Sequence, residues 1–510
     1  MKGCKRGAWA VAYMGLLLAG ALPGTALAQV PGVEVSTPPA ELADYFEQVR
    51  KAEAIKDPAQ RCLAYPDLPG NKWPEGAAAA RCAYLGQEVG FSLEDLRAIL
   101  DEADGAARLE AQMQALLEAH YSEPQQRDRI FKVFGRFDGG VAAGAVAVAW
   151  LRKAPRSPFA MTAMGTHRAN QGWKARGGAW AANTSAPQLQ RMNQEFAGAI
   201  PLLAEALELE PRLTRACLEL TGIGRMSSDR LQQHSLARCL QVDPLSYALV
   251  WEWMRSAMPK WGGSLEDMAV VAAYARKHGP QNPMLYSLLS EPAGYPAKEA
   301  KTYAEGKAGF VAASRAGPGA AMLRDAGHAF RAEDKEPWLA AMYWSQALRF
   351  WPDSTALLSA RGDLMYVLGQ FELALDDLLP AIKASPKDMA LHFTAGASLL
   401  MLDRLAQARP HLQRALKLEG FETAALERYC YTFIGSPGDT GTRQARDCTA
   451  TLVKLGPTNA SYWAWRYQAL VAAQDEGWPA AAAKFIRYAD RSNPGHEYLR
   501  KNLLDSGVEP

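Results

Sequence analysis

The sequence predicts an all-α protein, an α-solenoid of antiparallel helix pairs that is regular in its C-terminal part and degenerate in its N-terminal and middle parts. Three observations predict this fold class. Between Ala321 and Glu422, three units of 34 residues follow one another without a gap, closed by Pro352, Pro386 and Gly420. Small residues stand at fixed offsets before these closing residues. No run of alternating apolar and polar residues, the pattern of a half-buried strand, occurs in the chain.

The small residues of the 34-residue units predict close helix packing. Alanine stands twelve and five residues before each closing residue, and glycine fills one further equivalent position in two units: Ala340, Ala374 and Ala408; Ala347, Ala381 and Ala415; Gly362 and Gly396. Antiparallel helices approach to about 8–10 Å when small side chains line their crossing, and a proline after the second helix ends it. This pattern resembles the tetratricopeptide repeat (TPR) family, although Leu358 and His392 stand where that family prefers tryptophan. The resemblance implies stacked helix hairpins.

Residues 1–28 are predicted to be a cleavable signal peptide. A basic start and an apolar run over residues 7–22 precede Ala26-Leu27-Ala28, which matches the small-x-small pattern of signal peptidase sites. Cleavage after Ala28 would leave Gln29, which is not a cysteine, at the new terminus, so no lipid anchor is expected. An uncleaved anchor is the alternative. Since no later stretch reaches about 18 uninterrupted apolar residues, we expect a periplasmic or secreted protein with no membrane span after cleavage.

Composition and charge exclude some classes of partner. The chain has a formal net charge of +2, and the predicted leader holds three of its basic residues, so the mature protein would be close to neutral. Nucleic acids and anionic membranes require a basic surface, so we expect no nucleic-acid partner. With 49% apolar and 22% charged residues the chain is an ordinary globular protein in composition.

Six cysteines outside the leader fall into three local pairs, separated by 20, 22 and 18 residues: Cys62 and Cys82, Cys217 and Cys239, Cys430 and Cys448. Two antiparallel helices with a short turn bring residues at such separations face to face. We therefore predict three disulfides in an oxidising compartment. Other pairings among six cysteines and buried thiols at small packing positions are the alternatives. No Cys-x-x-Cys spacing occurs, so no zinc site is expected.

Before the regular units, the chain divides into a lead-in and two helical regions. Residues 29–40 are a Pro-rich extended lead-in, and residues 41–155 read as helical, with Ser92 as a helix cap and an apolar, buried helix over residues 141–151. Residues 156–320 contain degenerate repeats, and the spacing from Pro158 to Pro211 requires an inserted loop or a longer helix.

The degenerate region contains two short motifs. They are Trp173-Lys174-Ala175-Arg176-Gly177 and Pro259-Lys260-Trp261-Gly262-Gly263-Ser264. They resemble a bacterial family of unknown function found in exported TPR proteins, and this kinship implies no activity. The second motif predicts a turn in which glycine permits positive φ and Ser264 caps the next helix.

Residues 321–505 are expected to form the TPR-like part with its C-terminal cap. After the three regular units, two units of 37 residues end at Pro457 and Pro494. A polar helix from about His496 to Leu504 follows, as a solenoid needs at its end.

No motif for chemistry was found in the sequence. None of the eight histidines has His-Glu-x-x-His spacing, and neither a Gly-x-Ser-x-Gly elbow nor a phosphate-binding Gly-x-x-x-x-Gly-Lys occurs. The Glu-Ser and Gly-Leu-Met-Gln stretches of lytic transglycosylases are also absent. We therefore predict no catalytic residue, no cofactor and no metal site, and expect a protein that is not an enzyme.

Two sets of residues are candidates for binding. The first is an aromatic cluster in the degenerate region, with Glu252 and Arg255 interleaved: Trp173, Arg176, Trp180, Trp251, Trp253, Lys260 and Trp261. The cluster is either a pocket that grips a peptide or sugar or large side chains that fill gaps between irregular repeats. The second set is implied by the TPR resemblance as groove-facing: Asp325, Ser359, Asp363, Tyr366, Phe393 and Leu400. Its mixed, partly apolar character favours an apolar helix or extended segment, with Tyr366 and Phe393 as anchors.

Two functions are therefore open. The first is an exported scaffold or adaptor that binds a protein or peptide partner in the cell envelope. The alternative is an enzyme acting on peptidoglycan or glycans, with its site in the Trp-rich section 170–265. The enzyme would require a buried acidic residue with a raised pKa in a cleft beside Trp251 or Trp261.

Overall fold

The computed structural model describes residues 35–178, 183–333 and 335–510, so the predicted signal peptide lies outside the described residues. Every regular element of the described chain is a helix, and no strand occurs in it, which confirms the all-α class. The chain forms two compact units, one of residues 38–352 and one of residues 353–510 with the segment that ends at Thr37. Across the described residues, no helix has the length and apolar character to cross a membrane.

The unit of residues 38–352 begins with short helices and continues as helix hairpins. Its elements are α1 Ala40–Glu53, α2 Pro58–Ala64, α3 Ala77–Gly86, α4 Leu93–Asp101, α5 Gly105–Ser122, η1 Pro124–Gln126, α6 Arg129–Phe134, α7 Val141–Lys153, α8 Pro158–Arg176, α9 Ala186–Leu209, α10 Arg215–Ser227, α11 Asp229–Val242, α12 Tyr247–Ser256, η3 Pro259–Trp261, α13 Leu265–His278, η4 Pro283–Ser290, α14 Glu291–Lys298, α15 Tyr303–Ala316, α16 Ala320–Glu333 and α17 Pro337–Phe350.

Local signals fix several of these helices. Ser92 caps α4 through a capping box with Asp95, as predicted. The apolar helix α7 differs from the prediction, because Val141 and Val148 are 94% and 51% exposed. Only the face of α7 that carries Val146 and Trp150 is buried. The run is apolar all round, but α7 packs on one side only.

The long spacing between Pro158 and Pro211 is filled by lengthened helices. Helices α8 and α9 have 19 and 24 residues and pack along each other as a hairpin. Glycines on α8 permit this close approach: an added Cβ at Gly165 would lie 2.5 Å from Leu203, and one at Gly172 would lie 2.5 Å from Phe196. Hairpins α10–α11 and α12–α13 follow, and α10 also contacts both α8 and α12. The first helices of three successive hairpins therefore lie side by side.

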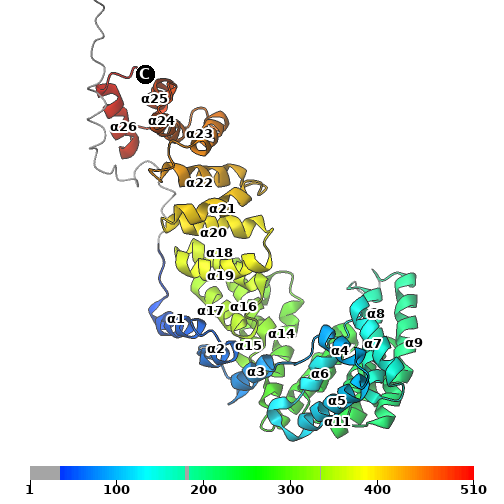
Figure 1. Ribbon diagram of the computed structural model, residues 1–510. Helices are drawn as coiled ribbons and strands as arrows, with labels where there is room; N and C mark the ends of the chain where they lie inside the picture. The colour runs from blue at the N-terminus through cyan, green and yellow to red at the C-terminus, as the bar shows by residue number, and fades with distance from the viewer. Residues whose placement is uncertain (1–34, 179–182, 334) are drawn as a thin grey trace, which may run out of the picture. The chain divides into compact units, whose positions relative to one another are not determined.

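The unit of residues 353–510 is a regular stack of hairpins (Figure 1). Helix α20 begins 34 residues after α18, and α21 begins 34 residues after α19, as the repeat period predicted. The elements are α18 Thr355–Val367, α19 Phe371–Ala384, α20 Met389–Met401, α21 Leu405–Ala415, α22 Glu422–Ile434, α23 Arg443–Leu455, α24 Ala460–Ala472, α25 Trp478–Tyr488 and α26 Pro494–Asp505.

Small residues occupy the crossings within these hairpins. Ala374 and Ala408 are completely buried, as predicted. The side chains nearest to the glycines lie one turn further along. An added Cβ at Gly362 would lie 2.8 Å from Leu378, and one at Gly396 would lie 2.7 Å from Leu412. Each hairpin thus alternates a small residue with a leucine across its crossing.

The three cysteine pairs are joined as disulfides, each between the two helices of one hairpin. The bridges are Cys62–Cys82, Cys217–Cys239 and Cys430–Cys448, with Cα–Cα distances of 5.6, 6.1 and 5.6 Å. These distances lie within the usual range for a disulfide, so the predicted spacing is confirmed.

Candidate functional site

A cleft of about 600 Å³ opens over helices α8, α10 and α12. From α8 it receives Asn170, Trp173 and Arg176, which share one face because they are three residues apart. Helix α8 ends at Arg176, since Gly177 adopts a positive φ of 74°. Trp173 is wedged against Phe196 of α9, with ring centroids 5.4 Å apart. The aromatic side of the cleft is therefore held by the α8–α9 hairpin.

Helix α10 forms the floor of the cleft. Arg215, Glu219, Gly222 and Arg225 follow at four- and three-residue steps and so line one face. Gly222 leaves space, because an added Cβ there would lie 3.5 Å from Glu252 Oε1.

Helix α12 and the 3-10 turn η3 supply the remaining wall. Glu252 and Arg255 come from α12, and Trp261 closes η3. Gly262 then turns the chain with φ of 90°, and Ser264 caps α13 by accepting the N–H of Asp267 at 3.0 Å. The predicted turn and cap are confirmed, and they place the Trp261 indole beside α10.

Four arginines and two glutamates line this cleft. Glu252 is buried and bridges two of the arginines, pairing with Arg225 and accepting from Arg255 Nη1 at 3.1 Å. Glu219 pairs with Arg215 on α10. The lining therefore carries two more cationic than anionic groups.

The guanidinium groups lie against the indole rings. Arg225 Cζ is 4.7 Å from the Trp261 ring centroid and 5.5 Å from that of Trp173. Arg176 Cζ is 5.7 Å from the Trp261 ring. The two indoles meet edge to face at 6.2 Å. Such contacts fix the guanidinium planes, whose edges can then donate to an oxyanion.

Burial also shifts the titration of groups around the cleft. It raises the pKa of Glu219, an effect that Arg215 opposes. It lowers the pKa of Arg225, against the effect of Glu252. Lys260 on the rim has a lowered pKa, chiefly from burial and then from the neighbouring cations Lys298 and Arg255. The local field at the rim is thus positive.

The structure divides the predicted aromatic cluster. Trp173, Arg176 and Trp261 line the cleft, so for these residues the pocket interpretation holds. Trp251 and Trp253 instead pack against a separate core around Val250 and Met254, which is the gap-filling interpretation. Lys260 is exposed, and its backbone N–H donates to Tyr295 Oη at 3.0 Å. Trp180 lies outside the described residues.

Sequence reasoning missed the contribution of α10. Arg215, Glu219 and Arg225 were not among the candidates, although they are central to the charge of the cleft. The available signal was their spacing: charged residues recur there with the three- and four-residue period of a buried helix face. Charges at packing positions indicate a site, because isolated buried charges are costly.

The predicted groove residues of the regular units are distributed differently. Ser359, Tyr366 and Phe393 are half-buried, Asp363 is exposed and Leu400 is buried. Asp325 is a correction: it belongs to the unit of residues 38–352, it is 4% exposed, and it pairs with Arg324 at 2.7 Å. Its carboxylate is therefore engaged within its own unit.

The two proposed anchors each keep part of the ring accessible. Tyr366 packs beside Phe371, with centroids 5.9 Å apart. Phe393 packs beside Phe421 at 5.4 Å and lies under Arg428, whose Cζ is 5.1 Å from its centroid. Because neither ring is fully buried, their role as anchors stays a prediction.

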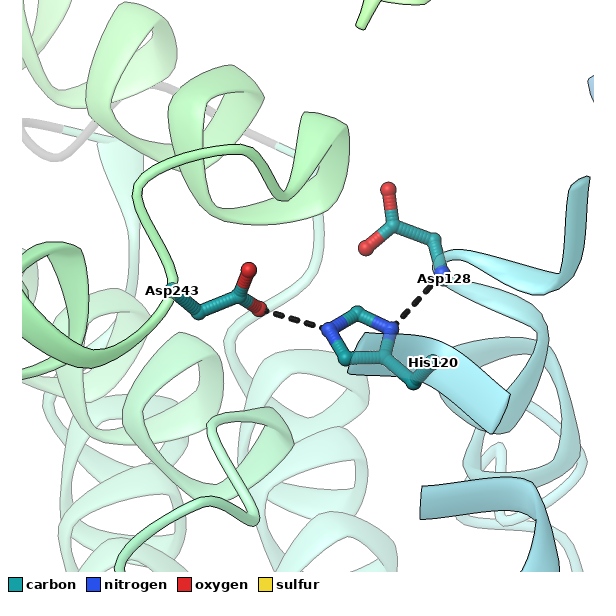
Figure 2. A group of neighbouring side chains, drawn as sticks. All are labelled: His120, Asp128 and Asp243. Carbon is teal, nitrogen blue, oxygen red and sulfur yellow. Dashed lines mark hydrogen bonds and ion pairs between the residues drawn. The ribbon is translucent and has the colours of Figure 1, made fainter. Parts of the chain in front are cut away.

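A buried polar cluster lies elsewhere in the same unit as the cleft (Figure 2). His120 Nε2 is 2.8 Å from Asp243 Oδ2, and its Nδ1 accepts the backbone N–H of Asp128 at 2.9 Å. Asp128 in turn accepts from Ser246 Oγ at 2.6 Å and from the Tyr247 N–H at 2.8 Å. Since both ring nitrogens are engaged, no histidine lone pair is left for a metal ion. The cluster ties the loop at Asp128 to the start of α12.

No protein-family model and no curated protein sequence matches this chain. Among solved structures the chain is similar to the P58(IPK) TPR domain, at 14% identity over 77% of this chain and 99% of that one, with a TM-score of 0.21. It is also similar to the APC/C hetero-tetramer Cut9–Hcn1, at 13% identity over 84% and 98%, with a TM-score of 0.28. Yeast Tom70 aligns at 11% identity over 77% and 85%, with a TM-score of 0.31.

The fold is that of a TPR-like solenoid. The 34-residue hairpins and their small-residue crossings carry this assignment. The kinship of residues 173–177 and 259–264 with a family of unknown function stays a prediction.

Proposed function

We propose that this solenoid is an exported scaffold that binds a protein or peptide partner in the cell envelope. The single observation that carries the proposal is the open cleft on the first helices of three successive hairpins. Helical-repeat proteins bind partners on extended faces of this kind. Three cysteine pairs at disulfide distance support an oxidising compartment, in keeping with the predicted signal peptide.

The regular units offer the second surface of the proposed scaffold. Tyr366 and Phe393 come from the first helices α18 and α20, and both remain partly accessible. Partly exposed aromatic rings are typical anchors of protein interfaces.

Cross-linking in intact cells tests the scaffold. A photo-reactive residue at exposed Asp363 should capture a partner, and Tyr366→Ala with Phe393→Ala should reduce that capture at least about tenfold. Val367→Ala with Leu379→Ala is the matched control, because both side chains are exposed in the same unit. Helix content by circular dichroism should be the same in all variants. A double variant that loses stability and keeps capture would show that the rings only pack.

A second candidate function, an enzyme acting on envelope glycans, is supported by Glu219. This carboxyl group is buried, lines the cleft with Trp261 and has a raised pKa, which are the features required of a general acid. Its ion pair with Arg215 opposes that role, because it favours the ionised form. Digestion of purified peptidoglycan by the protein, lost in Glu219→Gln, would establish the enzyme. Absence of any released fragment from the unaltered protein would remove it.

A further inference from the structure

We propose that the cleft over α8, α10 and α12 binds an extended acidic segment of another protein, one that carries two neighbouring aspartate or glutamate side chains. The inference rests on the proposed scaffold function and names the chemistry of the partner. Four arginines against two glutamates leave a lining that attracts two negative charges. The mature chain as a whole is close to neutral, so this concentration of charge is local.

The cationic groups gather at one end of the cleft. Arg176, Arg225 and Arg255 lie in the last turns of α8, α10 and α12. Because successive helices in hairpins alternate in direction, the first helices of three hairpins run parallel and their C-terminal ends lie together. Arg215 is ten residues before Arg225, about 15 Å away along the helix, and it is already paired with Glu219. One end of the cleft is therefore positive and the other is electrically balanced.

This length suits an extended chain. A peptide in β conformation advances about 3.3 Å per residue, so four or five residues would cover the floor of α10. Leu218 and Gly222 lie between the two charged ends and leave room for uncharged side chains. A small inorganic anion would use only the positive end.

The indole rings favour a carboxylate over a sugar. Sugar rings stack on bare aromatic faces, but Arg225 lies over Trp261 and Trp173, and Trp173 also packs against Phe196. The tryptophans thus orient guanidinium groups. A stacked guanidinium presents its N–H donors in the plane and matches the two oxygens of a carboxylate.

Arginines in last helical turns can also serve only to stabilise the helix ends. Arg225 does not fit that simpler role. Its side chain is 1% exposed, and its Nε has no hydrogen-bond partner among the described residues. Helix-end stabilisation operates at the surface and does not require burial of a guanidinium between two indoles, whereas a binding site does.

Pools of short, fluorescein-labelled, C-terminally amidated peptides test the inference. One pool has a central Glu-Glu pair with randomised flanks, and its match has Gln-Gln. The immobilised full chain should retain the Glu-Glu pool at least about tenfold better than the Gln-Gln pool, because a charge-assisted contact is lost in the latter. Added salt should weaken retention. Inorganic phosphate, an oligogalacturonide and a Gln-Gln pool with a free C-terminal carboxylate are the competing probes.

Variants locate the binding. Arg255→Gln and Arg176→Gln should each reduce Glu-Glu retention about tenfold. Arg238→Gln is the matched control, because Arg238 pairs with Glu208 on the same unit but does not line the cleft. Thermal melting must show that all three variants fold. Arg255 is 42% exposed, so its variant is the safest for stability.

The outcomes separate this inference from the scaffold proposal. Equal retention of the two pools, or equal loss in Arg238→Gln, overturns the acidic-segment inference. Preferential binding of the oligogalacturonide, of phosphate or of the free C-terminal carboxylate also overturns it. The scaffold proposal stands in those cases if cross-linking at Asp363 captures a partner that the Tyr366 and Phe393 changes release, and it fails with the inference if that capture fails too.

Discussion

Arg225 Cζ lies 4.7 Å from the ring centroid of Trp261, while the same guanidinium pairs with Glu252. This contact joins α10, α12 and the turn η3, three elements that are separated in sequence. A buried guanidinium needs both an anion and a polarisable surface to offset its desolvation. The geometry of the cleft therefore depends on this pair.

Trp261→Leu should loosen the cationic end of the cleft. The loss of the cation–π contact should lower the free energy of unfolding by roughly 1 kcal/mol and weaken retention of the Glu-Glu peptide pool. Urea unfolding and peptide retention measure the two effects. Trp253→Leu is the matched control, since Trp253 packs on Tyr274 outside the cleft. It should alter stability without altering retention, and the opposite result would contradict the assignment.

Ala374→Leu should overpack the α18–α19 hairpin. Ala374 is completely buried on α19, and extra methylene groups in a packed core destabilise by roughly 1–3 kcal/mol. Thermal melting measures the change. Ala384→Leu makes the same substitution at an exposed position of the same helix and should have little effect. Equal melting temperatures for the two variants would show that the repeat register is wrong.

Replacing both Cys217 and Cys239 with alanine should destabilise the α10–α11 hairpin. In the chain-entropy description, closing a loop of about this length contributes roughly 3 kcal/mol. Unfolding in denaturant without reductant should show the loss. With reductant, the unaltered protein also loses its bridges, so the difference between the two proteins should shrink. A difference that stays constant in reductant would assign the loss to packing alone.

Asp128 should make stability fall as the pH rises through the mildly acidic range. Burial raises its pKa to about 6, while His120 acts in the opposite direction. The unfolded chain, with an aspartate pKa of about 3.9, releases this proton between about pH 4 and 6, whereas the folded chain still holds it. The free energy of unfolding contributed by Asp128 is thus fully present below about pH 4. It declines by on the order of 3 kcal/mol as the pH passes 6.

Asp128→Asn tests this dependence, because asparagine keeps the size of the side chain and can bond to Ser246 and to the Tyr247 N–H. Urea unfolding at several pH values should show a drop between pH 4 and 6 in the unaltered protein that is absent in the variant. Parallel pH profiles for the two proteins would contradict the raised pKa.

The sequence by itself determined the repeat, the class and the cysteine pairing. A period of 34 residues, alanines such as Ala374 at the crossings and cysteines about 20 residues apart are local properties, because two helices of one hairpin are close in sequence. The cap at Ser264 was predictable for the same reason, since its hydrogen bond spans three residues.

The cleft was decided only by the tertiary structure. Trp173, Arg225 and Trp261 come from three segments, and their contacts depend on how α8, α10 and η3 pack. Composition showed that tryptophans and charges concentrate in this region but not which of them meet, so Trp251 was grouped with Trp261 although it packs against another core. A helix pattern fixes which residues share one face, whereas the pairing of faces depends on small residues at distant crossings, such as Gly165 and Gly172 on α8.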